Sequence, residues 1–160
     1  MINKGKFSNI YSPKVINDIV EKNEKVFYHD SAYRMIKHSK TKQTTKEDFY
    51  PTIMEYNNPQ FTMPNYFIQD RKNNLDQFST SCFDSRENLE QFIQSITSIR
   101  EDYEKNGWFI LSGRVNADKG FADEPMKSGP KKGHFNYFLY DPIGDSPLDD
   151  FTGKKEGKNE

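Results

Sequence analysis

Apolar residues recur at helical spacing in the first part of the chain. Ser12 and Pro13 are typical of a helix start, because a serine oxygen can cap backbone N–H groups and proline suits the first helical position. The apolar residues that follow share one face: Val15, Ile16, Ile19 and Val20. We therefore predict a helix that ends near Asn23. A second, short helix is predicted at Thr45, because Glu47 and Asp48 in its first turn would face the positive end of the helix dipole.

The longest helical pattern lies in the second half of the chain. Asp84 or Ser85 would cap its start, and Asn106 followed by Gly107 would end it in the left-handed conformation that glycine adopts readily. Between these ends the apolar residues are Leu89, Phe92, Ile93, Ile96 and Tyr103. Their near-ideal spacing predicts one long amphipathic helix.

Segments rich in β-branched and aromatic residues predict strands. These segments are residues 26–30, 33–36, 66–69, 78–83, 108–115 and 135–140, and the first two could form either one bent strand or a strand and a turn. The segment 108–115 begins with apolar residues on both faces, which is typical of a central strand. No helical pattern separates it from 135–140, so we expect these two strands to pair in an antiparallel manner. The polar segments 37–46, 57–74 and 116–132 predict loops.

The order of these elements indicates an α+β fold with a mainly antiparallel sheet and about three helices. We expect a single domain over residues 1–151 and a disordered tail over residues 152–160, where glycine and charged residues dominate. Hydrophobic residues make up only 33% of the 160 residues, but aromatic residues alone make up 14%. Since each buried aromatic side chain removes roughly 150–250 Å² from water, the composition predicts an aromatic-rich core.

Charge and apolar-run length exclude some classes of function. The formal net charge of −1 supplies no overall field toward phosphates, so we expect no dedicated nucleic-acid binding. No apolar run suits a membrane helix or a secretory signal, which predicts a soluble, cytoplasmic protein. The single cysteine, Cys82, excludes an internal disulfide. The abundance of lysine, asparagine and isoleucine suits an AT-rich bacterium or its phage.

Arginine residues are candidates for ligand binding. Arg34 follows Tyr33 among apolar neighbours, so we expect its guanidinium to be held in place. It could bind a phosphate or carboxylate of a ligand, with Tyr33 nearby, or it could form a structural pair with Asp48. Arg114, at the end of a predicted central strand, is the second candidate. The basic, glycine-containing segment 127–133 could contact phosphates or could be a solvated loop.

Histidine and serine residues near strand ends are candidate catalytic groups. His29 and His134 could meet across the sheet as acid–base groups, or each could hydrogen-bond backbone alone. Ser79 and Ser81 would lie on one face of their strand, with Ser81 as a candidate nucleophile and Ser79 as a candidate ligand-binding residue. The neighbouring Cys82 suits a small buried position. No zinc-site spacing is present, so no metal or cofactor is expected.

Four short motifs together resemble a group of small uncharacterised bacterial proteins. They are the pair Tyr33 and Arg34, then Thr45 with Asp48 and Phe49, then Ser81, Cys82, Phe83 and Asp84, and finally Gly133 and His134 before a closing strand. The resemblance extends over residues 33–141 and implies no particular activity.

Two segments are similar to parts of ADP-ribosyltransferase-like folds: residues 26–31 and residues 78–82. This similarity implies that His29 would contact the nicotinamide ribose of NAD. It also implies that Ser79, Thr80 and Ser81 would line the cofactor cleft. The late glutamate of an ExE motif has no counterpart in this chain.

We therefore expect a small bacterial or phage accessory protein that binds a protein partner, rather than an enzyme. Exposed aromatic side chains such as Tyr50, Tyr56 and Phe61 would anchor that partner. The alternative is an enzyme or sensor for a nucleotide-like ligand such as NAD. It requires four side chains to surround one cleft: His29, Arg34, Ser81 and His134.

Overall fold

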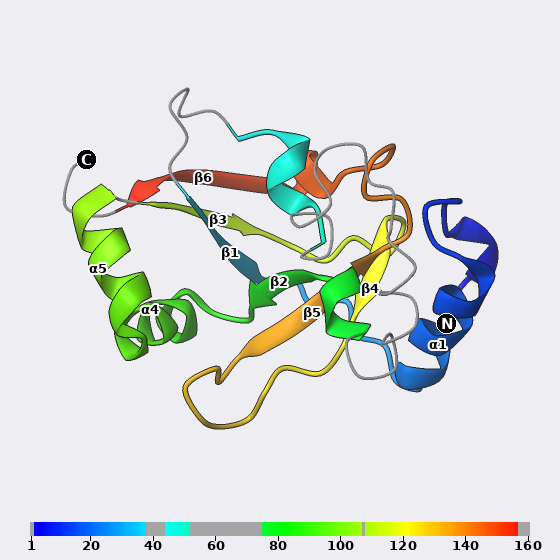
Figure 1. The fold of residues 1–160 in the computed structure, drawn as a ribbon, viewed down its shortest axis with the longest axis horizontal. Helices are drawn as coiled ribbons and strands as arrows, with labels where there is room; N and C mark the ends of the chain where they lie inside the picture. Colours follow the sequence, from blue (N-terminus) through cyan, green and yellow to red (C-terminus); the bar gives the residue numbers. More distant parts are fainter. Residues whose placement is uncertain (1, 38–43, 52–74, 107, 157–160) are drawn as a thin grey trace.

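The computed structural model of this protein describes residues 2–37, 44–51, 75–106 and 108–156. These residues form three α-helices and a six-stranded sheet whose neighbouring strands all run antiparallel. The order across the sheet is β4-β5-β2-β1-β3-β6 (Figure 1). The predicted α+β class, with a mainly antiparallel sheet, is confirmed.

The elements have the following bounds. The strands are β1 (Ala32–Lys37), β2 (Thr80–Phe83), β3 (Trp108–Gly113), β4 (Gly120–Ala122), β5 (His134–Leu139) and β6 (Phe151–Glu156). The helices are α1 (Pro13–Lys22), α4 (Arg86–Ser95) and α5 (Thr97–Asn106). The 3-10 helices are η1 (Lys4–Lys6), η2 (Lys46–Phe49), η3 (Leu75–Phe78) and η4 (Pro147–Asp150).

Helix α1 forms where the sequence predicts it. The Ser12 hydroxyl accepts a hydrogen bond from the Val15 backbone N–H at 3.2 Å, which satisfies one of the N–H groups that a helix start leaves unpaired. Val15 and Ile19 are fully buried. The Asn23 side chain closes the helix by donating to the Ile19 carbonyl oxygen at 2.8 Å.

Helices cover one face of the sheet at its two ends (Figure 1). The cluster under α4 and α5 has as its buried members Phe83, Leu89, Ile93 and Ile110. The cluster under α1 is rich in aromatic rings, among them Phe7, Tyr11, Phe78, Phe121, Phe138 and Tyr140. A third cluster fills the opposite face and includes Phe49, Cys82, Leu111, Phe135, Tyr137, Leu139 and Phe151. The predicted aromatic-rich core is therefore confirmed.

Residues 84–106 form two helices rather than the single long helix predicted. Ser85 caps α4, but α4 ends at Ser95 and the following Ile96 is extended, with φ −117° and ψ 114°. Residues 95–98 are all serine, threonine or isoleucine, which are weaker helix formers because their side chains lose rotamer freedom or compete for backbone groups. The Ser95 hydroxyl donates to the Phe92 carbonyl oxygen at 2.7 Å. The apolar spacing alone did not reveal this break.

The structure differs from the sequence-based prediction at residues 26–30 and at residues 116–132. Residues 26–30 do not form a strand, and the bridge described there joins Phe27 to Ala122. Residues 116–132, predicted as a loop, contain β4, where Phe121 and Ala122 are fully buried. Its three-residue length explains why no strand pattern was visible in the sequence.

The predicted pairing of residues 108–115 with residues 135–140 is also wrong. β3 pairs with β1 and β6, whereas β5 pairs with β2 and β4. The short strand β4 lies between β3 and β5 in the chain, and it supplies one of the partners of β5. β3 is nevertheless internal to the sheet, as predicted.

The predicted disordered tail begins too early. Residues 152–156 belong to β6, which pairs with β3 and places Thr152 opposite Ser112. An edge strand needs backbone pairing on one side only and tolerates charged residues, so its polar composition concealed it. Residues 157–160, the predicted strand 66–69 and the predicted loop 57–74 lie outside the described residues. Within the described chain, no helix is both long and apolar enough to span a bilayer.

Candidate functional sites

Arg34 joins three segments at the point where β1 and β2 separate. The registered pair between these two strands is Tyr33 with Phe83. The Arg34 guanidinium donates from Nε to the Asp48 carbonyl oxygen at 2.8 Å and from Nη1 to the Ser81 carbonyl oxygen at 2.7 Å. Such charge-assisted hydrogen bonds are stronger than neutral ones. The guanidinium is held as predicted, through the backbone of Asp48 and of β2.

A serine and a histidine meet on the face of the sheet that carries the helices. Ser81 of β2 lies opposite Asn136 of β5, and Phe83 lies opposite His134. Ser81 and His134 are therefore diagonal neighbours on one face. The Ser81 hydroxyl and the His134 Nε2 atom are hydrogen-bonded. Two residues that the sequence singled out separately are thus in direct contact.

Gly133 determines where His134 lies. Its φ is +86°, in the left-handed region that favours glycine. A Cβ atom at this position would lie 2.3 Å from Asp84 Oδ1 and 2.5 Å from Asn88 Nδ2. The Gly133 carbonyl oxygen accepts a hydrogen bond from the Asp84 backbone N–H at 2.9 Å. This close approach ties the start of β5 to the start of α4.

Arg34, Ser81 and His134 line one small cavity of about 90 Å³, together with Lys131. The remaining walls are apolar and are formed by Met35, Phe83, Leu89 and Phe92. Burial, together with the smaller effect of the positive charge of Lys131, lowers the pKa of His134 to about 4. The imidazole is therefore neutral at pH 7, and one of its ring nitrogens is an acceptor.

Further polar residues continue from the cavity toward the α1 end of the sheet. The Ser79 hydroxyl lies 2.6 Å from the Asp76 carbonyl oxygen and 3.0 Å from Asn136 Oδ1. Asn136 donates from Nδ2 to Asp123 Oδ2 at 2.8 Å and from its backbone N–H to Asp123 Oδ1 at 2.7 Å. Burial raises the pKa of Asp123, and the hydrogen bonds from Asn136 oppose this shift. We refer to Ser79, Ser81, Asp123, His134 and Asn136 as the polar band.

Ser79 is one of the predicted ligand-binding residues, and the structure places it inside the protein. It is 1% exposed, and its hydroxyl is already close to two acceptors. It does not line the cavity that Ser81 lines. The Ser79 hydroxyl therefore serves hydrogen bonds inside the protein.

His29 lies apart from the cavity and does not meet His134; of the two alternatives, the contact of His29 with a backbone group is the one that the structure shows. The His29 ring stacks on Phe27 at 5.7 Å and lies 4.3 Å from the Phe135 ring, centroid to centroid. Its Nε2 atom is 3.1 Å from the Asp123 carbonyl oxygen. Phe135 points to the opposite face of the sheet from His134, because side chains alternate along a strand.

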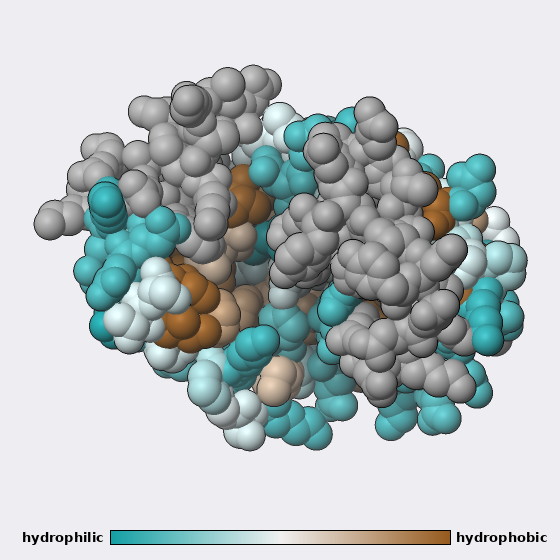
Figure 2. Space-filling view, viewed as in Figure 1, coloured by the Kyte–Doolittle hydropathy of each residue, from teal (hydrophilic) through white to brown (hydrophobic). Residues whose placement is uncertain are grey.

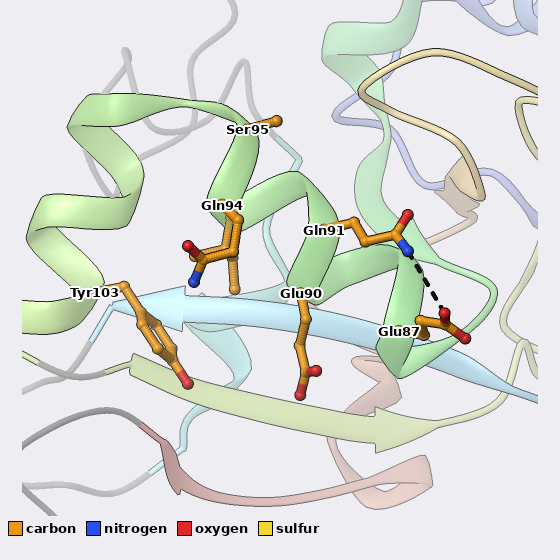
Figure 3. A pocket seen from close by; sticks show the side chains of 7 residues that line it. Glu87, Glu90, Gln91, Gln94, Ser95 and Tyr103 are labelled. Atoms are coloured by element: carbon orange, nitrogen blue, oxygen red, sulfur yellow. Dashed lines mark hydrogen bonds between the residues drawn. The ribbon is translucent and has the colours of Figure 1, made fainter.

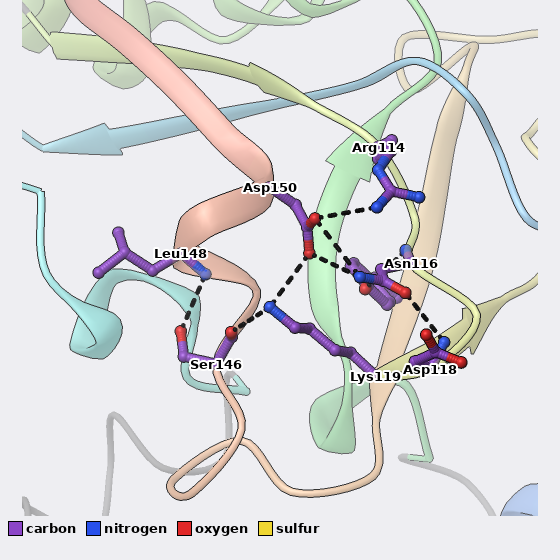
Figure 4. A network of polar contacts seen from close by, with 8 residues as sticks. Arg114, Asn116, Asp118, Lys119, Ser146, Leu148 and Asp150 are labelled. Atoms are coloured by element: carbon purple, nitrogen blue, oxygen red, sulfur yellow. Dashed lines mark hydrogen bonds and ion pairs between the residues drawn. The ribbon is translucent and has the colours of Figure 1, made fainter.

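The two remaining candidates, Tyr33 and Arg114, do not line the cavity. Tyr33 is half-buried and packs against the cluster under α4 and α5. Arg114 Nη2 is 3.3 Å from Asp150 Oδ1. The Asp150 carboxylate also contacts Lys119 Nζ at 3.3 Å and Asn116 Nδ2 at 3.2 Å (Figure 4). This network connects η4 to the segment after β3, which gives Arg114 a structural partner.

Sequence reasoning missed Asn136 and Asp123 of the polar band. An available signal was the single asparagine within the aromatic run of β5, because a polar residue in a buried strand needs partners. Cys82 is buried as expected, and burial raises the pKa of its thiol to about 12. Of the basic segment 127–133, Lys131 lines the cavity and Lys127 pairs with Glu124 at 3.4 Å.

A larger pocket of about 480 Å³ lies along α4 and α5 (Figure 3). It is lined by Glu87, Glu90, Gln91, Ile93, Gln94, Ser95 and Tyr103. Ile93 is buried, whereas the glutamates and glutamines are exposed or partly exposed. In Figure 2, apolar side chains lie among hydrophilic ones at the end of the molecule that carries these helices. The sequence did not reveal this pocket, because both helices form it and the break at Ile96 was not predicted.

Exposed aromatic anchors are scarce in the described chain. Its exposed large hydrophobic residues are Tyr28 and Met126. Tyr50 is only 8% exposed, so its predicted role as an exposed anchor is wrong. Tyr56 and Phe61 lie outside the described residues.

Neither a family model, nor a curated protein, nor a solved structure matches this chain. Within the ranges that the structure describes, no three histidine, cysteine, aspartate or glutamate residues are grouped so that they could hold a metal ion.

Proposed function

We propose that this protein acts by binding a protein partner, and that the pocket along α4 and α5 receives a side chain of that partner. The observation that carries the proposal is the pocket itself. It is about 480 Å³ in volume and combines the buried Ile93, the ring of Tyr103 and a polar rim. An aromatic or aliphatic side chain that enters such a pocket is the usual energetic centre of an interface.

The charge of the pocket favours a basic segment in the partner. Both carboxylates of the lining belong to α4, and the lining contains no lysine or arginine. Glu90 pairs with Arg86 at 3.0 Å, in an ion pair whose side chains are 52% and 40% exposed. Surface ion pairs contribute little to stability, so an incoming lysine or arginine can replace Arg86 at low cost. The expected partner segment carries an apolar residue next to a basic one.

The nucleotide-handling alternative has weaker support. Pockets for cofactors and drug-sized ligands usually measure about 300–1,000 Å³, whereas the cavity at Ser81 measures about 90 Å³. His29, which the similarity to ADP-ribosyltransferase-like folds would place on the ribose, does not line that cavity.

Site-specific photocrosslinking in the native host tests the proposal. A photoreactive amino acid replaces Gln94 at the pocket, and in a matched strain it replaces Lys14, which is exposed on α1. We expect a protein adduct from position 94 that position 14 does not give. The captured protein must then bind the purified chain directly, through a segment with a basic residue next to an apolar one.

A pair of charge reversals then tests the role of the pocket. Glu90→Lys should weaken binding of the captured partner at least tenfold, which corresponds to about 1.4 kcal/mol. Glu104→Lys makes the same change at an exposed position of α5 outside the lining, and it should leave binding unchanged. Equal effects of the two variants, or adducts at both crosslinking positions, would contradict the proposal.

A further inference from the structure

The contact between Ser81 and His134 has the geometry of a nucleophile with its general base. A serine hydroxyl reacts efficiently only when a base lies within hydrogen-bonding reach. Here the Ser81 hydroxyl is hydrogen-bonded to His134 Nε2. Both residues lie on paired strands, and Gly133 fixes the approach to His134 through its contacts with α4. Sites built on strands hold such pairs more precisely than loops do.

The walls of the cavity indicate which group would react there. Four apolar side chains form half of the lining: Met35, Phe83, Leu89 and Phe92. A volume of about 90 Å³ admits a group of only a few heavy atoms, since one water molecule takes up about 30 Å³ of liquid. The charge of Lys131, which is also in the lining, would favour negative charge that develops in the cavity.

We propose that Ser81 is a nucleophile that accepts a short acyl group from an ester, with His134 as the general base. The Ser81 Oγ atom attacks the carbonyl carbon, and its proton passes to His134 Nε2. The bond from the carbonyl carbon to the leaving oxygen then breaks, and the leaving alcohol takes the proton from His134. A water molecule next attacks the acyl-serine and gives one proton to His134. Ser81 regains that proton, and the short carboxylic acid is released.

Reaction with p-nitrophenyl acetate and p-nitrophenyl octanoate tests this activity on the full chain. The release of p-nitrophenolate is followed by absorbance, and peptide mass spectrometry locates the acetyl group. We expect acetyl-Ser81 and a kcat/KM at least tenfold higher for the acetate than for the octanoate, because the cavity excludes the longer chain. Acetylation confined to lysine side chains, or no preference for the short ester, would overturn the proposal.

Variants separate the reaction from a merely structural hydrogen bond. Ser81→Ala and His134→Gln should each lower the rate at least tenfold, while Ser98→Ala, at an exposed serine of α5 that lines neither the cavity nor the larger pocket, should not. If Ser81→Ala does not fold, Ser81→Cys supplies the second test. Its thiol should be alkylated by iodoacetamide at least tenfold faster with His134 present than in the double variant with His134→Gln. Equal alkylation rates, or full activity in Ser81→Ala, would refute the role of Ser81. Neither result depends on the proposed partner pocket, because the probes are small esters.

Discussion

Two glycines show how much a single residue contributes to the position of the cavity. Gly129 and Gly133 have nearly the same positive φ, +88° and +86°. A Cβ atom on Gly129 would meet no atom within 4 Å, whereas one on Gly133 would collide with Asp84 and Asn88. The two positions therefore separate the cost of a left-handed backbone from the cost of a close approach.

We predict that Gly133→Ala destabilises the protein more than Gly129→Ala does. The left-handed backbone should cost about 1–2 kcal/mol in both variants. Gly133→Ala should cost about 1–3 kcal/mol more, because the start of α4 must move. Urea unfolding of the two variants measures both free energies. Equal losses would mean that the contact between Gly133 and α4 contributes little.

The buried imidazole of His134 should make stability depend on pH. Its pKa is about 4 in the folded protein and close to 6.5 in the unfolded chain. As pH falls below 6.5, the unfolded state takes up the proton first, so the folded state loses stability until pH 4. The difference corresponds to a loss of about 3 kcal/mol. The raised pKa of Asp123 acts in the opposite direction, since it favours proton uptake by the folded state.

The urea midpoint at pH 7 and at pH 4.5 measures this dependence. In His134→Gln, the fall in the urea midpoint from pH 7 to pH 4.5 should be much smaller than in the unchanged protein. His29→Gln, which makes the same change at the histidine outside the cavity, should retain it. If His134→Gln kept the full decrease, other groups would account for the acid sensitivity.

At the scale of secondary structure, elements that depend on neighbouring residues could be predicted from the sequence, whereas strands that depend on a distant partner could not. α1 could be predicted from its cap and its apolar face, because both depend on neighbouring residues. β6 could not, because its residues are polar and its partner β3 lies about 40 positions earlier in the chain. Arg34, Ser81 and His134 could each be picked out as candidates. That they meet, and that His29 does not join them, follows from the strand order β5-β2-β1, which no local pattern specifies.

The assignment of residues 152–156 to β6 leads to a prediction about hydrogen exchange. A chain that ends at Phe151 lacks most of β6 and leaves β3 at the edge of the sheet. The amide groups of β3 should then exchange faster, while those of β5 should change little. A chain that ends at Glu156 retains all of β6 and should match the full-length protein. Hydrogen–deuterium exchange of a peptide over residues 108–113 makes the comparison. Equal protection in both shortened chains would contradict the pairing.

At the scale of the whole molecule, α4 lies between the two candidate sites. Leu89 and Phe92 line the cavity at Ser81, whereas Glu90 and Gln94 line the larger pocket. Any movement of α4 therefore changes the walls of both sites together. A partner that binds along α4 and α5 and a group in the cavity would influence each other through this one helix.

The polar band has a consequence for how the molecule opens. It lies on the same face of the sheet as the apolar cluster under α1 and the cluster under α4 and α5. Cooperative units of a native protein often follow such apolar clusters, and each unit has its own free energy of opening. We therefore expect the end of the molecule that carries α1 to open transiently while the end that carries Ser81 and α4 stays closed. Partial unfolding of this kind would expose one half of the protein to proteases without exposing the other.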